Sequence, residues 1–72
     1  MSNQFQNDSD YYQDYKKRLS AMIFEKAKGK IPQDMCNDLA RIGTEHKKYD
    51  DFQDKERSIE ERVDYLISAY FA

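Results

Sequence analysis

The chain has 72 residues, of which 39% are hydrophobic and 36% are charged, and its formal net charge at pH 7 is −2. A chain of this length forms one small domain with a marginal core, because folding buries only about 60% of the surface that the unfolded chain exposes. One proline and two glycines are too few turn residues for a sheet of many strands, so the composition favours an all-α fold.

Several classes of protein are excluded by short sequence features. The single cysteine, Cys36, excludes an internal disulfide and leaves little for a metal site. The first ten residues lack the basic and apolar regions of a signal peptide, and no run approaches the roughly 18 apolar residues of a membrane span. We therefore expect a cytoplasmic protein that binds no metal, no cofactor and no membrane.

A first helix is expected over about residues 9–28. The preceding residues 1–8 are polar and unpatterned, which predicts a disordered tail before a single helical domain over 9–72. Leu19 marks the centre of the apolar stripe. The residues that share its face are Tyr12, Tyr15, Met22 and Ile23. Gly29 fits the C′ position just after the helix end.

A second helix is expected over 32–49, with Pro32 at its first position, where a missing N–H costs nothing. Its apolar stripe is centred on Leu39. The other residues in that stripe are Met35, Cys36, Ile42, Gly43, His46 and, at its edge, Tyr49. Gly43 in a helix interior indicates close approach of another backbone. The short link over 29–31 predicts an antiparallel hairpin.

A third helix is expected over 58–71, because Ser58 and Glu61 form a capping box. Residues 50–57 precede it, and we interpret them as a charged linker with a helical first half. One side of the third helix is apolar and comprises Ile59, Val63, Leu66 and Tyr70. The predicted architecture is a small three-helix bundle, made of an antiparallel helical hairpin plus a C-terminal helix.

Charge is unevenly distributed along the chain. Residues 15–30 carry six basic residues and one acidic residue, whereas 50–72 carry seven acidic and three basic residues. The simplest interpretation is that a basic first helix and an acidic third helix attract each other within the bundle.

No pattern of residues indicates catalysis. The sequence has no nucleophile paired with a base, no glycine-rich phosphate loop and no helical H-E-x-x-H motif, so we do not expect an enzyme. His46, the only histidine, is interpreted as a half-buried residue near Tyr12 and Tyr15, with a general base or pH switch as the alternative. Cys36 is interpreted as a small core residue.

Several aromatic residues do not fit the apolar stripes. Large aromatic residues are enriched in protein interfaces, so these residues predict a partner surface or self-association. The alternative is that the helix phases are wrong and these residues are core. The interface candidates are the aromatic residues Phe24, Phe52, Tyr65 and Phe71 and the acidic residues Asp50, Asp51 and Asp54.

The leading functional hypothesis is a small non-catalytic regulator or inhibitor that binds a larger enzyme or complex, of a kind common among phage and mobile-element genes. One alternative is a nucleic-acid-binding module that uses the basic face of the first helix. Its candidate phosphate contacts are Lys16, Lys17, Arg18, Lys26, Lys28 and Lys30, with Arg41, Lys47 and Lys48 as an extension. A structural homo-oligomer, with the same aromatic residues paired across a symmetry axis, is the other alternative.

Overall fold

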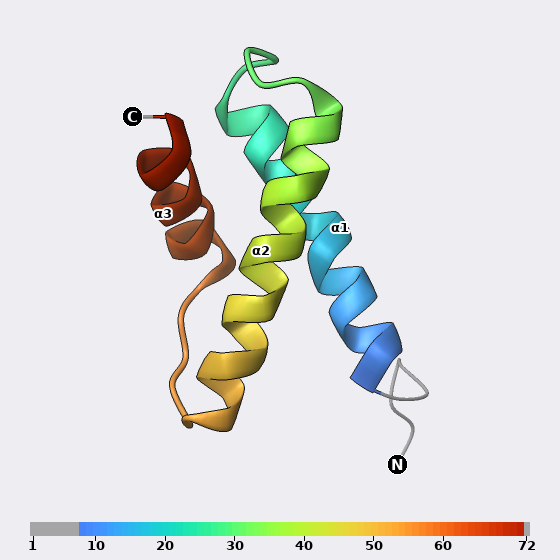
Figure 1. Ribbon diagram of the computed structural model, residues 1–72, viewed down its shortest axis with the longest axis vertical. Helices are drawn as coiled ribbons and strands as arrows, with labels where there is room; N and C mark the ends of the chain where they lie inside the picture. The colour runs from blue at the N-terminus through green and yellow to red at the C-terminus, as the bar shows by residue number, and fades with distance from the viewer. Residues whose placement is uncertain (1–7, 72) are drawn as a thin grey trace.

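The computed structural model describes residues 8–71, which form three helices, α1 (Asp8–Lys26), α2 (Gln33–Phe52) and α3 (Ile59–Phe71) (Figure 1). The first two helices form an antiparallel hairpin, and α3 lies beside α2 near the hairpin loop (Figure 1). The predicted all-α, three-helix architecture is confirmed.

Five of the six predicted helix ends differ from the observed ends by one to three residues, and the end of the third helix at residue 71 agrees. α1 ends two residues early and α2 extends three residues further, to Phe52. Residues 53–58 link α2 to α3, so the predicted linker with a helical first half is close to the observed structure. The predicted disordered tail lies outside the described residues, except for Asp8, which begins α1.

A single core is shared by all three helices. Its buried hydrophobic side chains are Tyr15, Leu19, Ile23, Ile31, Cys36, Leu39, Ala40, Val63 and Leu66. Cys36 is completely buried and its thiol faces the carbonyl of Ile31 at 3.6 Å. Burial raises the pKa of this thiol, which fits the predicted role of a core residue rather than a reactive cysteine.

Gly43 of α2 lies where side chains of α1 and α3 meet. A Cβ atom added there would lie 2.8 Å from Cδ1 of Leu19 in α1 and 2.8 Å from Cδ1 of Leu66 in α3. Such distances are shorter than van der Waals contact, so only glycine fits without displacement of neighbouring atoms. The predicted close packing at this glycine is present, but the predicted neighbour is wrong, because the three nearest atoms belong to side chains and not to another backbone.

Three residues predicted to be buried are exposed. Met35, Tyr49 and Tyr70 have exposed fractions of 44%, 62% and 53%. The buried face of α2 instead includes the smaller Ala40 and Thr44, whose hydroxyl donates to the Ala40 carbonyl at 2.7 Å. Small side chains face the neighbouring helices where the helices approach closely, so the buried face is rotated away from the larger apolar residues.

The α1 terminus has a different cap from the predicted one. Lys28 occupies the left-handed C′ position with φ of 55°, and Gly29 follows with φ of 76°. The Lys28 amide donates to the Glu25 carbonyl and the Gly29 amide to the Phe24 carbonyl, which together form a Schellman motif. Gly29 is therefore at C″ rather than at C′. Pro32 likewise caps α2 instead of beginning it.

The start of α3 agrees with the sequence. The Ser58 backbone N–H donates to Oε1 of Glu61, and the Glu61 backbone N–H donates to Oγ of Ser58, both at 3.0 Å. The predicted capping box is confirmed.

Replacing Lys28 with glycine should stabilise the protein. A side chain in the left-handed region costs about 1 kcal/mol relative to glycine, and the Schellman hydrogen bonds use only backbone atoms. We expect Lys28→Gly to raise the free energy of unfolding by about 0.5–1 kcal/mol in urea titrations. Lys30→Gly is the control, because the Lys30 backbone is not in the left-handed region. It should not raise the free energy of unfolding. Equal effects of both substitutions would contradict the prediction.

Gly43→Ala should destabilise the fold although alanine favours helices. Alanine gains about 1 kcal/mol in helix propensity, but overpacking a filled core costs about 1–3 kcal/mol. Because Leu19 and Leu66 are completely buried, their methyl groups cannot turn into solvent. We expect a net loss of about 1 kcal/mol in urea unfolding. In a Leu66→Ala background, Gly43→Ala should lower the free energy of unfolding by less, because one of the crowding methyl groups is absent. A Gly43→Ala variant that is more stable than the wild type would contradict the steric argument.

Candidate functional site

The side chain of Arg62 connects all three helices. Arg62 lies in α3 and is buried, with an exposed fraction of 5%. Its Nε donates to the hydroxyl of Tyr15 in α1 at 3.0 Å, and its terminal nitrogen donates to Oδ2 of Asp50 in α2 at 2.5 Å. A buried guanidinium is costly unless it is paired and hydrogen-bonded, and these two bonds meet that requirement.

Asp50 is held in its charged form by this contact. The hydrogen bond from Arg62 lowers the pKa of the Asp50 carboxyl below its ordinary value, against the smaller opposing effect of burial. Arg57 lies on the linker with its Nε 3.8 Å from the same carboxylate oxygen, and its side chain is mostly exposed. Arg62 is thus the principal partner of Asp50, and most of the Arg57 side chain remains accessible.

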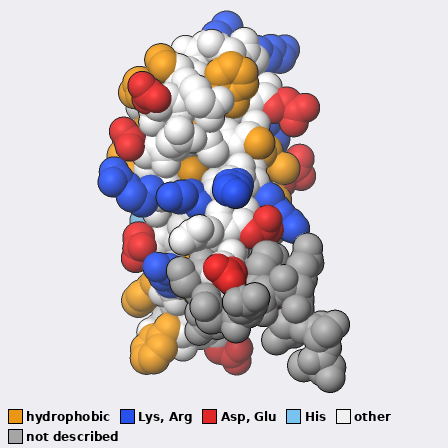
Figure 2. Space-filling model, turned by 90° about the vertical axis from the view of Figure 1, so that its right-hand side faces the viewer, with side chains coloured by type: hydrophobic (Ala, Val, Ile, Leu, Met, Phe, Trp, Pro, Cys, Tyr) orange, Lys and Arg blue, Asp and Glu red, His pale blue; other side chains and the backbone are white. Residues whose placement is uncertain are grey.

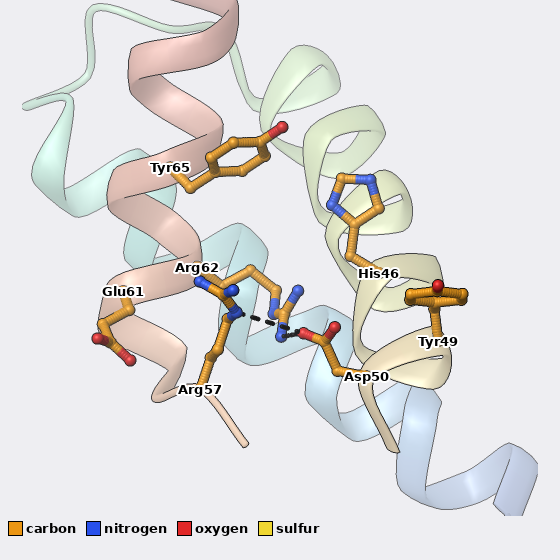
Figure 3. A pocket seen from close by; sticks show the side chains of 7 residues that line it. All are labelled: His46, Tyr49, Asp50, Arg57, Glu61, Arg62 and Tyr65. Atoms are coloured by element: carbon orange, nitrogen blue, oxygen red, sulfur yellow. Dashed lines mark hydrogen bonds and ion pairs between the residues drawn. The ribbon is translucent and has the colours of Figure 1, made fainter. Parts of the chain in front are cut away.

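A pocket of about 310 Å³ opens above this ion pair, between α2 and α3 (Figure 3). Its lining residues are His46, Tyr49, Asp50, Arg57, Glu61, Arg62 and Tyr65. Figure 3 shows His46 and Tyr49 on α2 and Tyr65 on the facing side of α3. The His46 and Tyr65 ring centroids are 6.0 Å apart, and the rings are tilted by 56°. The pocket therefore has aromatic walls and a charged floor.

The two carboxylates of the pocket already have partners within the chain. Asp50 accepts from Arg62, and Glu61 accepts from the backbone N–H of Ser58 in the capping box. The accessible polar groups that line the pocket include the Arg57 guanidinium and the tyrosine hydroxyls, which donate hydrogen bonds, together with the half-buried His46 imidazole and the exposed Glu61 carboxylate. This arrangement suits an apolar group that carries a carboxylate or carbonyl beside it.

The predicted surroundings of His46 are wrong, although it is half-buried as expected. It faces Tyr65 of α3 rather than the tyrosines of α1. The hydroxyl of Tyr12 instead donates to Asp51 at 2.7 Å, and that of Tyr15 accepts from Arg62. The hairpin register places both tyrosines opposite the end of α2, beyond His46.

All four aromatic interface candidates are exposed, so the alternative that they belong to the core is wrong. Phe24 and Phe71 each have an exposed fraction of 39%, Tyr65 has 56% and Phe52 has 84%. They do not form one patch. Tyr65 lines the pocket between α2 and α3, Phe71 lines a second pocket beside the hairpin loop, and Phe52 ends α2.

The acidic candidates differ in their availability. Asp50 binds Arg62, and Asp51 accepts from Tyr12 and from Lys47, the latter at 3.1 Å. Asp54 is exposed at the left-handed turn after α2, with φ of 59°.

Two of the basic candidates, Lys26 and Arg18, are paired with acidic side chains. Lys26 of α1 binds Asp64 at 2.8 Å and Glu60 at 3.5 Å, so the predicted attraction between the first and third helices is confirmed. Arg18 pairs with Asp14 at 2.9 Å. Figure 2 shows a band of basic side chains across the α1 side, with acidic side chains above and below it.

The other basic candidates are exposed. Lys17, Lys28 and Lys30 lie on the surface of α1 and of the hairpin loop. Only Lys16 of the predicted set shares a pocket with Arg41 and Lys48 of the predicted extension.

Arg62 is the residue that sequence reasoning missed. It lies three residues after Ile59 and four before Leu66, which is the spacing of the buried face of α3. This spacing could have indicated a buried position, but the apolar stripe was assigned from apolar residues alone and Arg62 is charged.

Comparison with protein-family models, with curated proteins and with solved structures gives no match to this chain. Within residues 8–71, no helix has the length and apolar character to cross a bilayer, and no three His, Cys, Asp or Glu side chains gather as a metal site. The functional argument therefore depends on the chemistry of the surfaces just described.

Acid should weaken the fold through Asp50. Its pKa is lowered by folding, so its stabilising effect is complete above the ordinary carboxyl pKa of about 4 and is lost as the pH falls through the lower folded value. We expect Asp50→Asn to lower the melting temperature at pH 7 and to show a weaker loss of stability below about pH 4 than the wild type. Thermal unfolding followed by circular dichroism measures both effects.

Asp38→Asn is the matched control, because it removes an exposed carboxylate from the same helix. It should lower the melting temperature at pH 7 far less than Asp50→Asn. If the two substitutions lower the melting temperature at pH 7 equally, the Asp50–Arg62 ion pair does not hold the helices together.

Proposed function

We propose that the chain is a small non-catalytic regulator that binds a larger protein, with the pocket between α2 and α3 at the centre of the contact. The observation that carries this proposal is the pair of exposed tyrosines, Tyr49 and Tyr65, on the walls of a pocket whose floor is a satisfied ion pair. Tyrosine and arginine are enriched among residues that dominate binding energy at protein interfaces.

The amount of exposed apolar surface supports the same proposal. Among the described residues, eight large hydrophobic side chains are more than a third exposed, on a chain of only 72 residues. Single exposed apolar residues are normal on any protein, but grouped ones mark interaction sites. The grouping at the pocket, which Tyr49 and Tyr65 both line and where His46 faces Tyr65, is the feature that singles out this surface.

The chemistry of the pocket specifies what it would bind. The aromatic walls suit an aliphatic or aromatic side chain, and the exposed guanidinium of Arg57 suits a carboxylate next to it. The proposed occupant is therefore an apolar residue flanked by an acidic one, on the surface of the larger protein. Because the ion pair below is already satisfied, binding would not leave a buried charge unpaired.

Nucleic-acid binding has one observation in its favour. Lys16, Arg41 and Lys48 line one pocket between α1 and α2. Glu45 lines the same pocket and pairs with Lys48 at 3.3 Å, which reduces its positive charge. This surface therefore supports the second proposal less strongly than the aromatic pocket supports the first.

Capture of a partner from host lysate, with and without nuclease, followed by affinity measurement on the captured protein, tests the proposal. Tyr65→Ala should weaken binding by about 10- to 100-fold, as expected for loss of an aromatic residue at an interface centre. Tyr70→Ala is the matched control, since it removes an equally exposed tyrosine from α3 that does not line the pocket. It should leave the affinity unchanged.

Two results would overturn the proposal. Equal affinity of Tyr65→Ala and wild type for the captured protein would show that the pocket is not the binding site. Loss of all captured material after nuclease treatment, together with loss in Lys16→Glu, would establish the nucleic-acid function instead. Circular dichroism of each variant confirms that the fold is retained.

A further inference from the structure

A second pocket lies at the hairpin-loop end of the molecule and combines an apolar floor with a basic rim. Its volume is about 480 Å³. The floor includes Ile31 of the loop and Ile67 and Phe71 of α3. The rim includes Lys28 and Lys30, which are exposed and form no ion pair with any residue between 8 and 71. This surface is complementary to an apolar side chain with acidic neighbours.

An exposed apolar side chain with acidic neighbours is found at the opposite end of the same molecule. Phe52, the last residue of α2, has an exposed fraction of 84%, the highest of the large hydrophobic side chains in the described part of the chain. Asp54 and Glu56 follow it, and both are exposed and form no ion pair within residues 8–71. Lys55 lies between them, so residues 52–56 have a net charge of −1. Arg57 follows, and its guanidinium lies 3.8 Å from the Asp50 carboxylate.

The two surfaces lie at opposite ends of the longest axis of the molecule, which measures 41 Å (Figure 1). The hairpin loop is at one end of that axis, and the turn after α2 is at the other. The acidic end of one molecule therefore cannot reach its own basic pocket, but it can reach the pocket of a second molecule.

We infer that Phe52 of one copy binds in the loop-end pocket of a second copy, where Asp54 and Glu56 lie against Lys28 and Lys30. Both halves of this contact are found on the same chain, with matching polarity and opposite charge, so a second copy is the occupant that the structure favours. Because two different surfaces meet, the contact is heterologous, and repeating it forms an open head-to-tail chain rather than a closed dimer.

The association should be weak and sensitive to salt. One side chain with a charged rim buries far less area than a stable interface does. The charges at the rim are exposed, so added salt screens them. A small contact of this type forms at high protein concentration and dissociates on dilution.

Sedimentation velocity of the full chain over a wide concentration range tests the inference. The wild type should show a mass that rises continuously with concentration beyond that of a dimer, and that falls as salt is added. Phe52→Ala should weaken the association at least about tenfold. Tyr70→Ala removes another exposed aromatic residue outside both surfaces and should behave as the wild type.

Charge reversal provides the sharper test. Lys28→Glu with Lys30→Glu should abolish the association, and so should Asp54→Lys with Glu56→Lys. Mixing these two double variants should restore it, because each then offers a surface complementary to the other. Lys16→Glu with Lys17→Glu changes the net charge by the same amount at two exposed lysines of α1 that line neither surface, so this variant is the control and should leave the association unchanged.

Three results would overturn the inference. They are a wild type that stays monomeric at every concentration, a closed dimer that does not grow, and an association that survives Phe52→Ala. A monomeric wild type whose loop-end pocket binds an acidic peptide would assign that pocket to another protein. Failure here is distinguishable from failure of the proposed function, because Tyr65→Ala should leave self-association intact. Phe52→Ala should leave partner binding intact when it is measured at dilutions where the wild type is monomeric.

Discussion

A buried guanidinium determines how the third helix lies on the hairpin. Arg62 reaches Tyr15 in α1 and Asp50 in α2 at the same time, while only 5% of its surface is exposed. If α3 slid or rotated, both bonds would break and a charge would remain buried without a partner, which is far more costly than the loss of apolar contacts alone. Together with the close approach at Gly43, this contact fixes the position of α3 and so creates the pocket between α2 and α3.

Much of the fold was predictable because its signals are local. The helical periods, the capping box at Ser58 and the glycine at 43 each depend on residues within a few positions of one another. The buried face of α2 was harder to predict, because a count of large apolar residues places Tyr49 inside and overlooks Ala40 and Thr44. Which of these is buried depends on how closely a neighbouring helix approaches, and that distance is a property of the assembled bundle rather than of one helix.

The candidate surfaces were predictable only as separate parts. The helix phases correctly placed Tyr65 and Phe52 outside the core, yet they could not show that one lines a pocket and the other ends a helix. Asp50 was grouped with surface carboxylates, because a charge pattern does not distinguish a solvated carboxylate from one that holds a buried arginine. The Asp50–Arg62 contact joins two helices across a linker, and nothing in the sequence specifies where that linker places the second helix.

The positions of the two proposed contacts have a consequence for binding strength. The pocket lined by Tyr49 and Tyr65 lies along the side of the molecule, whereas Phe52 and the loop-end pocket lie at its ends. Head-to-tail association would therefore leave the side pocket open on every copy. A chain of copies would present that pocket at regular intervals, so that a partner with repeated binding segments would meet a high local concentration of sites. Weak contacts at the ends would then increase the apparent affinity at the side pocket without any new contact to the partner, and the increase would disappear on dilution.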